Sequence, residues 1–132
     1  MTARERFTSA RVARLATTGP DGPHVVPIVF AVAGDTLYHA VDHKPKRTTA
    51  LKRLANLRAD PRASVLADLY DEDWTHLWWA RADGTARILE PGHPEAVALL
   101  RDRYPQYRDA PPEGPVVAIQ VTRWSQWESS GG

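Results

Sequence analysis

Clusters of glycine, proline and aspartate divide this chain into short segments. These turn signals are the sequence feature that most limits what the chain can fold into. Gly19-Pro20-Asp21-Gly22-Pro23 is a turn signal, and so is Ala33-Gly34-Asp35. The segment between them, His24–Val32, is rich in Val and Ile, as β-strands are. Apolar residues on both of its faces favour a central strand, whereas Pro27 favours a sheet edge or a bulge. Together with the residues after Gly34, this segment predicts a β-hairpin.

The remaining segments predict a mainly β protein with a few helices. Thr2 and Glu5 have the spacing of a capping box, which indicates a helix from Thr2 to about Ala10. Asp83-Gly84 is a hairpin dipeptide between two strand-like runs. The predicted strands are Arg11–Thr18, His24–Val32, Thr36–Asp42, Ala63–Tyr70, Thr75–Ala82, Thr85–Leu89 and Val116–Trp124. Further helices are expected from Thr48 or Thr49 to Arg58 and over Pro94–Arg103, with a proline-rich loop over Pro105–Pro115. Six or seven strands with peripheral helices suggest a small β-barrel.

Composition removes several classes of protein. At 132 residues the chain fits one domain. It has no cysteine, which excludes disulfide scaffolds, thiol catalysis and cysteine-ligated metals. The net charge of +1 favours neither a nucleic-acid nor a membrane partner. No apolar run is long enough to span a bilayer and no signal peptide is visible at the N-terminus, so we expect a cytoplasmic protein.

A basic cluster is the strongest local feature. His43-Lys44-Pro45-Lys46-Arg47, followed by Lys52 and Arg53, lies between a predicted strand and the start of a predicted helix. Cations beside the free N–H groups of a helix start can bind a phosphate. The alternative interpretation is a solvated basic surface. The spacing therefore predicts an anion site without deciding between these two interpretations.

Tryptophan is the second feature. The run Asp73-Trp74-Thr75-His76-Leu77-Trp78-Trp79, if it were a strand, would place Trp74, His76 and Trp78 on one face, and Trp79 with Arg81 on the other. One face can fill a barrel. The other then needs a second subunit or a flat ligand to cover Trp79, although core packing is the simpler interpretation for any single indole.

Other site chemistries find no support in the sequence. The glycines never take the spacing of a dinucleotide fingerprint or a P-loop, and no nucleophile elbow is present. His39 and His43 would lie some 13 Å apart on an extended strand, too far to share an ion. Because the other histidines are scattered, we expect no metal site. Asp71, Glu72 and Asp73 are interpreted as a solvated turn.

A resemblance to a known family covers nearly the whole chain. The stretch from Val41-Asp42-His43-Lys44-Pro45-Lys46 through Arg53-Leu54-Ala55-Asn56-Leu57-Arg58-Ala59-Asp60-Pro61-Arg62-Ala63-Ser64 resembles the pyridoxamine-phosphate-oxidase-like split-barrel superfamily. The stretch Asp71-Glu72-Asp73-Trp74, with Leu77-Trp78-Trp79 and Asp83-Gly84, is similar to its actinobacterial branch of F420-dependent oxidoreductases. Tyr104-Pro105-Gln106-Tyr107 is similar to the same branch.

The resemblance implies a homodimer of six-stranded antiparallel split β-barrels of the FMN-binding type, with a cofactor in a groove at the dimer interface. The phosphate would meet the basic loop, the ring would lie along two strands, and the partner subunit would contribute Trp78 and Trp79. The residues implied at the cofactor are Val26, Pro27, Ile28, His39, Val41, Asp42, Lys44, Lys46, Arg47, Lys52, Arg53, Asn56, Trp78 and Trp79.

The implied activity is hydride transfer between reduced coenzyme F420 and a small organic substrate. The cofactor carries this chemistry, so no side chain need be catalytic, and Tyr38 or His39 could orient the ring or donate a proton. Two alternatives stay open. One is an FMN-binding oxidoreductase of the same fold, and the other is a protein that binds or stores a cofactor without catalysis.

Overall fold

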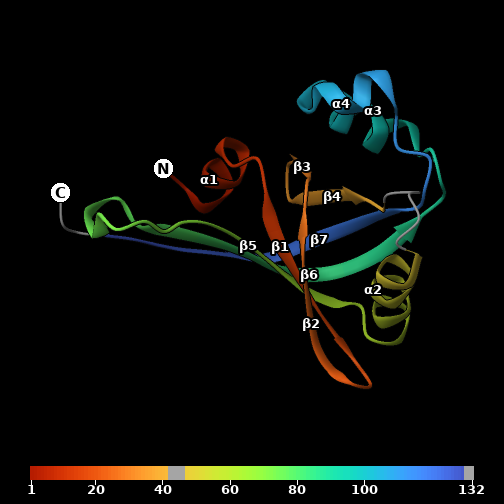
Figure 1. The fold of residues 1–132 in the computed structure, drawn as a ribbon, viewed down its shortest axis with the longest axis horizontal. Coiled ribbons are helices and arrows are strands. Elements are labelled where there is room, and N and C mark those ends of the chain that lie inside the picture. Colours follow the sequence, from red (N-terminus) through yellow and green to blue (C-terminus); the bar gives the residue numbers. More distant parts are fainter. Residues whose placement is uncertain (42–46, 130–132) are drawn as a thin grey trace.

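The computed structural model describes residues 1–41 and 47–129, and only the backbone of residues 47–51. Figure 1 shows a curved sheet with helices on both sides. The strands are β1 (Ala13–Gly19), β2 (Gly22–Ile28), β3 (Ala31–Ala33), β4 (Thr36–Ala40), β5 (Arg62–Leu69), β6 (Trp78–Leu89) and β7 (Val116–Glu128). The helices are α1 (Ala3–Ser9), α2 (Arg47–Ala59), α3 (Pro94–Arg103) and α4 (Pro105–Asp109), with a 3-10 turn, η1, over Trp74–His76.

All seven strands belong to one antiparallel sheet in the order β2-β1-β5-β6-β7-β4-β3. The two edge strands, β2 and β3, follow one another in the chain and are joined by residues 29 and 30 alone. The three Cα–Cα steps from Ile28 to Ala31 span at most about 11 Å, so the sheet must curl until its edges approach. Those edges do not pair within the part of the chain that the structure describes, which makes the fold a split barrel. The predicted mainly β fold is thus confirmed, with seven strands rather than six.

Strand alternation separates an inner face from an outer face. On β5 the side chains of Ala63, Val65 and Ala67 are buried in the main core, while Ser64, Leu66 and Asp68 alternate with them and are only partly buried. Because successive side chains of a strand point to opposite faces, the second set lies on the outer face of the sheet. The outer face is therefore mixed polar and apolar.

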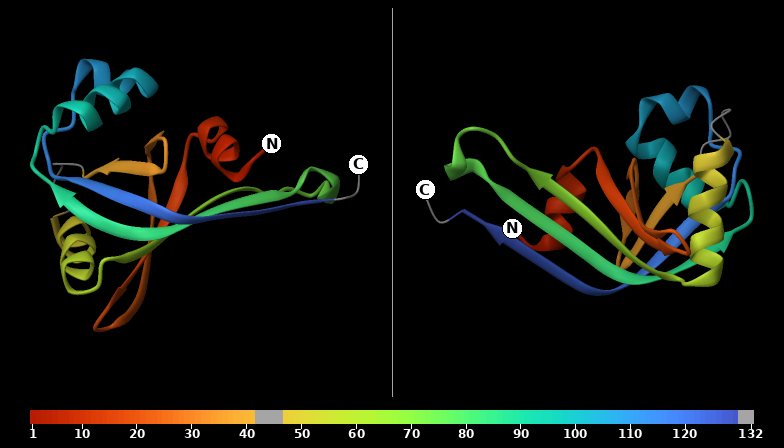
Figure 2. Two further views of the ribbon diagram at one scale, coloured as in Figure 1. Left: turned by 180° about the vertical axis from the view of Figure 1, so that it is seen from behind. Right: turned by 60° about the horizontal axis from the view of Figure 1, so that its bottom comes forward.

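The helices cover the sheet from two sides, as Figure 1 and the views in Figure 2 show. α1 begins with the predicted capping box between Thr2 and Glu5 and buries Phe7 in the main core. α2 lies on the opposite side from α1 and packs on β1 and β6. α3 covers a second, smaller cluster that contains Tyr38, Leu100 and Tyr104.

The predicted hairpin at Asp83-Gly84 is wrong. β6 runs unbroken through both residues and pairs with β7, with a register shift between Asp83 and Gly84. A Cβ at position 84 would lie 2.1 Å from the carbonyl oxygen of Gln120, so glycine permits the close approach of the two strands. The dipeptide marks a β-bulge, for which glycine is as typical as it is for a turn.

Other boundaries also differ from the predictions. The segment His24–Val32 is divided between β2 and β3. β2 is an edge strand, so the indication from Pro27 is confirmed and the central position favoured by the apolar faces is wrong. Residues 74–76 form a 3-10 turn instead of a strand, because the Asp73 carboxylate caps the turn by accepting from the Thr75 amide at 3.1 Å. The expected loop after residue 104 contains α4, which starts at Pro105, a favourable first helical residue.

No helix in the described ranges 1–41 and 47–129 has the length and apolar character needed to cross a membrane.

Candidate functional site

A buried pair of polar side chains joins α2 to the barrel. His39 lies on the inner face of β4 with 4% of its surface exposed, and Arg53 on α2 is 9% exposed. The His39 Nδ1 atom lies 3.2 Å from the carbonyl oxygen of Val29, and Nε2 lies 2.5 Å from Arg53 Nη1. A carbonyl can only accept, so Nδ1 carries the proton and donates to it. Nε2 then accepts from the guanidinium.

α2 buries Arg53 because of its helical spacing. Leu54 and Leu57 are three residues apart on the same helix and both lie in the main core, and Arg53 stands beside them on that stripe. Its Nε is buried and has no hydrogen-bond partner, and no carboxylate pairs with its guanidinium among the described residues. Burial lowers the pKa of Arg53 below its usual value, but an arginine keeps its charge. A buried cation with free donors favours an anionic ligand.

His39 is held in the neutral form. Burial, and then the positive charge of Arg53, lower the pKa of His39 to about 3, while the hydrogen bond to Val29 opposes the shift. At neutral pH the imidazole is therefore an acceptor for Arg53 and holds no second proton to donate. Tyr38, the other candidate for orienting a ring, points to the opposite face of β4 and is buried in the smaller cluster beneath α3.

The rest of α2 divides between structural and exposed residues. Asn56, predicted at the cofactor, is 2% exposed and donates from Nδ2 to the Thr17 hydroxyl at 3.1 Å. A Cβ on Gly19 would lie 2.3 Å from Asn56 Oδ1, so the amide fills the space that glycine leaves. Lys52 and Arg58 are exposed on the same helix. Asn56 thus anchors α2 to β1, and the exposed cations remain available to a ligand.

The strands predicted to bind the ring carry some of the predicted residues on the inner face of the barrel and others on the outer face. Val26 and Ile28 on β2 point into the main core, and so does Val41 after β4. Pro27, and Val25 before it, are exposed on the outer face of this edge strand. A flat ligand lying on β2 would therefore contact Pro27 through its side chain. Asp42, Lys44 and Lys46 lie outside the described residues, and so does the side chain of Arg47.

The two indoles predicted from a partner subunit point in different directions. Trp78 packs against the main core beneath the guanidinium of Arg6, whose Cζ lies 4.8 Å from the ring centroid. Trp79 is on the outer face, where Arg81 lies 5.8 Å from its ring centroid. In Figure 1 the start of β6 lies at the end of the sheet away from α2. One chain therefore does not bring Trp78 or Trp79 to Arg53.

Trp79 lines a hollow of about 400 Å³ on the outer face, together with Leu66, Asp68, Tyr70 and Arg81. A polar cluster lies beside it on the same face. Asp83 accepts from the Ser64 hydroxyl at 2.6 Å and from Arg81 Nε at 3.1 Å. Aromatic walls next to fixed charges suit contact with a flat polar molecule or with a second protein surface.

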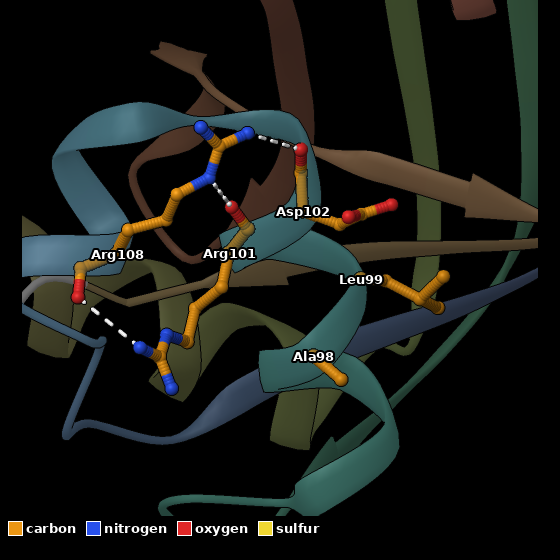
Figure 3. A pocket seen from close by; sticks show the side chains of 5 residues that line it. All are labelled: Ala98, Leu99, Arg101, Asp102 and Arg108. Carbon is orange, nitrogen blue, oxygen red and sulfur yellow. Dashed lines mark hydrogen bonds between the residues drawn. The ribbon is translucent and has the colours of Figure 1, made fainter.

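A second hollow, of about 500 Å³, lies between α3 and α4 (Figure 3). The two arginines that line it donate hydrogen bonds to carbonyl oxygens. Arg108 donates to the carbonyls of Arg101 and Asp102, and Arg101 donates to that of Arg108. These carbonyls include the last ones of α3, where the helix dipole is negative and favours cations. The pair joins α3 to α4, so we assign this hollow a structural role.

Sequence reasoning found Arg53 and His39 as separate candidates but missed their contact. The helical position of Arg53, beside Leu54 and Leu57, was a signal that its side chain is buried. Nothing in the sequence pairs it with a histidine on β4. In the described ranges no group of three or more His, Asp or Glu side chains is placed to hold a metal ion.

The curled sheet that stays open between β2 and β3, covered by α2 on one side and by α1 and α3 on the other, defines the class of split-barrel proteins. The family model of pyridoxamine 5'-phosphate oxidase matches residues 2–128. The chain therefore belongs to the pyridoxamine 5'-phosphate oxidase family.

Solved structures agree with this assignment. The conserved hypothetical protein Rv2991 from Mycobacterium tuberculosis is 26% identical, with a TM-score of 0.73 over 99% of this chain and 87% of that one. A FAD-binding protein from Mesorhizobium loti (mll6688) is 22% identical, with a TM-score of 0.65 over 94% and 90% of the two chains. The heme storage protein HutZ from Vibrio cholerae is 14% identical, with a TM-score of 0.70 over 98% and 95%. The last two show a likeness of fold alone. No curated protein matches this chain.

Proposed function

We propose that this protein binds coenzyme F420, with FMN as the alternative, and transfers a hydride between that cofactor and a small organic substrate. The observation that carries the proposal is Arg53, a buried guanidinium whose Nε has no partner among the described residues. Both cofactors carry a phosphate or phosphodiester group on the side chain of the ring. Such a group supplies the negative charge and the acceptor oxygens that this arginine lacks.

The residues fit a flavin-type cofactor in two places. Arg53, with Lys44 and Lys46 of the neighbouring basic stretch, would hold the phosphate. Pro27, exposed on the edge strand β2, would support the ring. When bound, the cofactor supplies the hydride-transfer chemistry. The protein binds and orients it, and neutral His39 keeps the charge of Arg53 uncancelled.

Two observations bear on the choice of cofactor. F420 has an acidic oligoglutamate tail beyond its phosphodiester, and Lys52 and Arg58 offer exposed cations on α2, the helix that carries Arg53. This favours F420 by charge complementarity. The likeness of fold to a FAD-binding protein keeps a flavin as the alternative. A protein that stores a cofactor without catalysis is the other alternative, and the heme storage protein HutZ has the same fold.

The proposed functional unit is a homodimer. Trp79 and its hollow lie on the outer face, at the end of the sheet away from α2. Leu69, Tyr70, Trp74 and Trp127 expose large hydrophobic surface at this same end. Exposed apolar clusters of this kind are typical of protein interfaces. A second copy that covered them could bring its Trp79 to the cofactor held by the first.

Fluorescence titration of the purified protein with F420 and with FMN tests the proposal. We expect the wild type to bind F420 more tightly than FMN. Arg53→Met should weaken binding by about tenfold or more, because it removes charge-assisted hydrogen bonds. Arg87→Met, which changes an exposed arginine on β6 outside the proposed phosphate and tail contacts, is the control and should have a much smaller effect. If the wild type binds neither compound, the proposed function is wrong. If it binds FMN more tightly, the flavin alternative replaces F420.

A further inference from the structure

His39 connects Arg53 to the link between the two edge strands of the split barrel. Its Nδ1–H donates to the carbonyl of Val29, in the two-residue link between the edge strands β2 and β3, and its Nε2 accepts from Arg53 Nη1. Both side chains are at least nine-tenths buried. The ring is thus held at one nitrogen by the backbone, and it holds the guanidinium with the other.

We propose that His39 is a positioning residue that orients the Arg53 guanidinium toward the phosphate of the cofactor, and so determines how strongly the site prefers phosphorylated over unphosphorylated ligands. This inference rests on the proposed function, since it assumes that Arg53 meets a phosphate. It adds a residue that acts through Arg53 without touching the ligand.

The chemistry of the pair explains why a histidine suits this position. A carboxylate at position 39 would orient Arg53 equally well, but it would neutralise the charge and compete with the phosphate. An apolar residue would leave the charge intact and the long side chain free to rotate, at a cost in side-chain entropy on binding. A neutral imidazole accepts one hydrogen bond without adding negative charge. Arg53 therefore keeps both its orientation and its full positive charge.

The N–H donors of Arg53 fall into one that His39 uses and others that remain for a ligand. A guanidinium has five N–H donors in a rigid planar fork, and the contact with His39 uses one of them, on Nη1. Nε is buried without a partner among the residues that the structure describes. Fixing Nη1 in the plane of the fork also fixes the directions of Nε and Nη2. A guanidinium held in this way presents its remaining accessible N–H groups to a phosphate in one fixed direction.

Two substitutions separate positioning from packing. His39→Gln places its Oε1 near the position of Nε2 and keeps an acceptor for Arg53. His39→Phe keeps the ring volume and removes both hydrogen bonds. His39→Asn keeps a donor for Val29 and loses the acceptor, so it replaces the phenylalanine variant if that variant does not fold. Circular dichroism establishes folding before any titration.

The readout is the preference for the phosphorylated ligand, expressed as a ratio of two dissociation constants. For the flavin pair it is the constant of riboflavin divided by that of FMN. For the deazaflavin pair it is the constant of the phosphate-free deazaflavin core divided by that of F420. We expect His39→Phe or His39→Asn to lower this preference for the phosphorylated ligand by about tenfold, as loss of an oriented charged hydrogen bond would. His39→Gln should keep it close to the wild-type value. In the background of Arg53→Met, His39→Phe or His39→Asn should have no further effect on the ratio.

Two results would overturn the inference. His39→Phe could leave the ratio unchanged, and an equal weakening of both ligands would then indicate packing alone. His39→Gln could lose the preference as fully as His39→Phe. In both cases the wild type still prefers the phosphorylated ligand through Arg53, and the proposed function stands. A wild type that binds none of the four compounds overturns the proposed function and this inference together.

Discussion

A histidine that lies between a carbonyl oxygen and a guanidinium can satisfy both only in its neutral form. Protonation of His39 would place a second positive charge 2.5 Å from Arg53 in a buried site. This explains why burial and Arg53 together lower its pKa to about 3 from an ordinary value of 6.5. The same ring is exposed to water in the unfolded chain and takes up a proton there at mildly acidic pH.

The stability of the protein should therefore depend on pH through His39. Between about pH 3 and pH 6.5 the unfolded state binds more protons than the native state, so the free energy of unfolding falls as the pH falls through this window and is constant above it. The slope from one such group is at most about 1.4 kcal/mol per pH unit. Urea unfolding between about pH 5 and pH 7, where carboxylates stay ionised, measures it.

His39→Gln is the matched variant for this measurement, because glutamine does not titrate. The difference in unfolding free energy between wild type and variant should shrink as the pH falls from 7 to 5. A difference that stays constant over this range would contradict a neutral, buried His39.

At the scale of elements, one arginine fastens α3 to α1. Arg103, in the last turn of α3, donates to the carbonyls of Phe7 and Thr8 at 3.3 and 2.9 Å and also to that of Ala10. These carbonyls lie at the C-terminal end of α1, where a helix leaves its acceptors unpaired. Its guanidinium also lies 4.9 Å from the ring centroid of Phe30. Two helices that do not adjoin in sequence are thus held together over the sheet.

Arg103→Met should lower the free energy of unfolding by about 2 to 3 kcal/mol, since several hydrogen bonds from a charged group are lost while much of the apolar stem is kept. Chemical denaturation followed by tryptophan fluorescence measures the change. Arg87→Met, at an exposed position on β6, is the control and should stay within about 0.5 kcal/mol of the wild type. Equal effects of the two substitutions would mean that the contacts to α1 carry no special weight.

At the scale of the whole molecule, the exposed apolar residues are unevenly distributed. Trp74 has 74% and Trp127 has 42% of its surface exposed, and both lie at the end of the sheet where β6 begins. Leu66 and Trp79 line the hollow on the adjoining outer face. α2, with Arg53, lies at the other end in Figures 1 and 2. An interface over the outer face would bury the apolar end and complete the site.

We expect light scattering at micromolar concentration to give twice the mass of one chain. Leu66→Asp should shift the equilibrium toward the monomer, because it places a charge in the middle of the proposed interface. Glu95→Lys on α3 is the control and should leave the mass unchanged. A wild-type protein that is monomeric at this concentration would remove the homodimer from the proposed function.

Local chemistry in the sequence predicted much of the fold. The capping box of α1, the helical spacing of α2 and the hairpin around Gly34 depend on neighbouring residues, and all are confirmed. The bulge at Gly84 was misread as a turn because both need glycine. Only the pairing with Gln120 on a distant strand distinguishes them. The sequence could not predict α4 either, since Pro105 suits a loop and a helix start equally well.

By itself, the sequence determined the mainly β class and the presence of a basic segment after β4, because turn residues, strand alternation and charge can be read from short windows. Only the tertiary structure decided that Arg53 is buried against His39 and that Trp79 lies at the far end of the sheet from both. Those facts depend on how far the sheet curls and where α2 crosses it, which are set by contacts between residues distant in the chain.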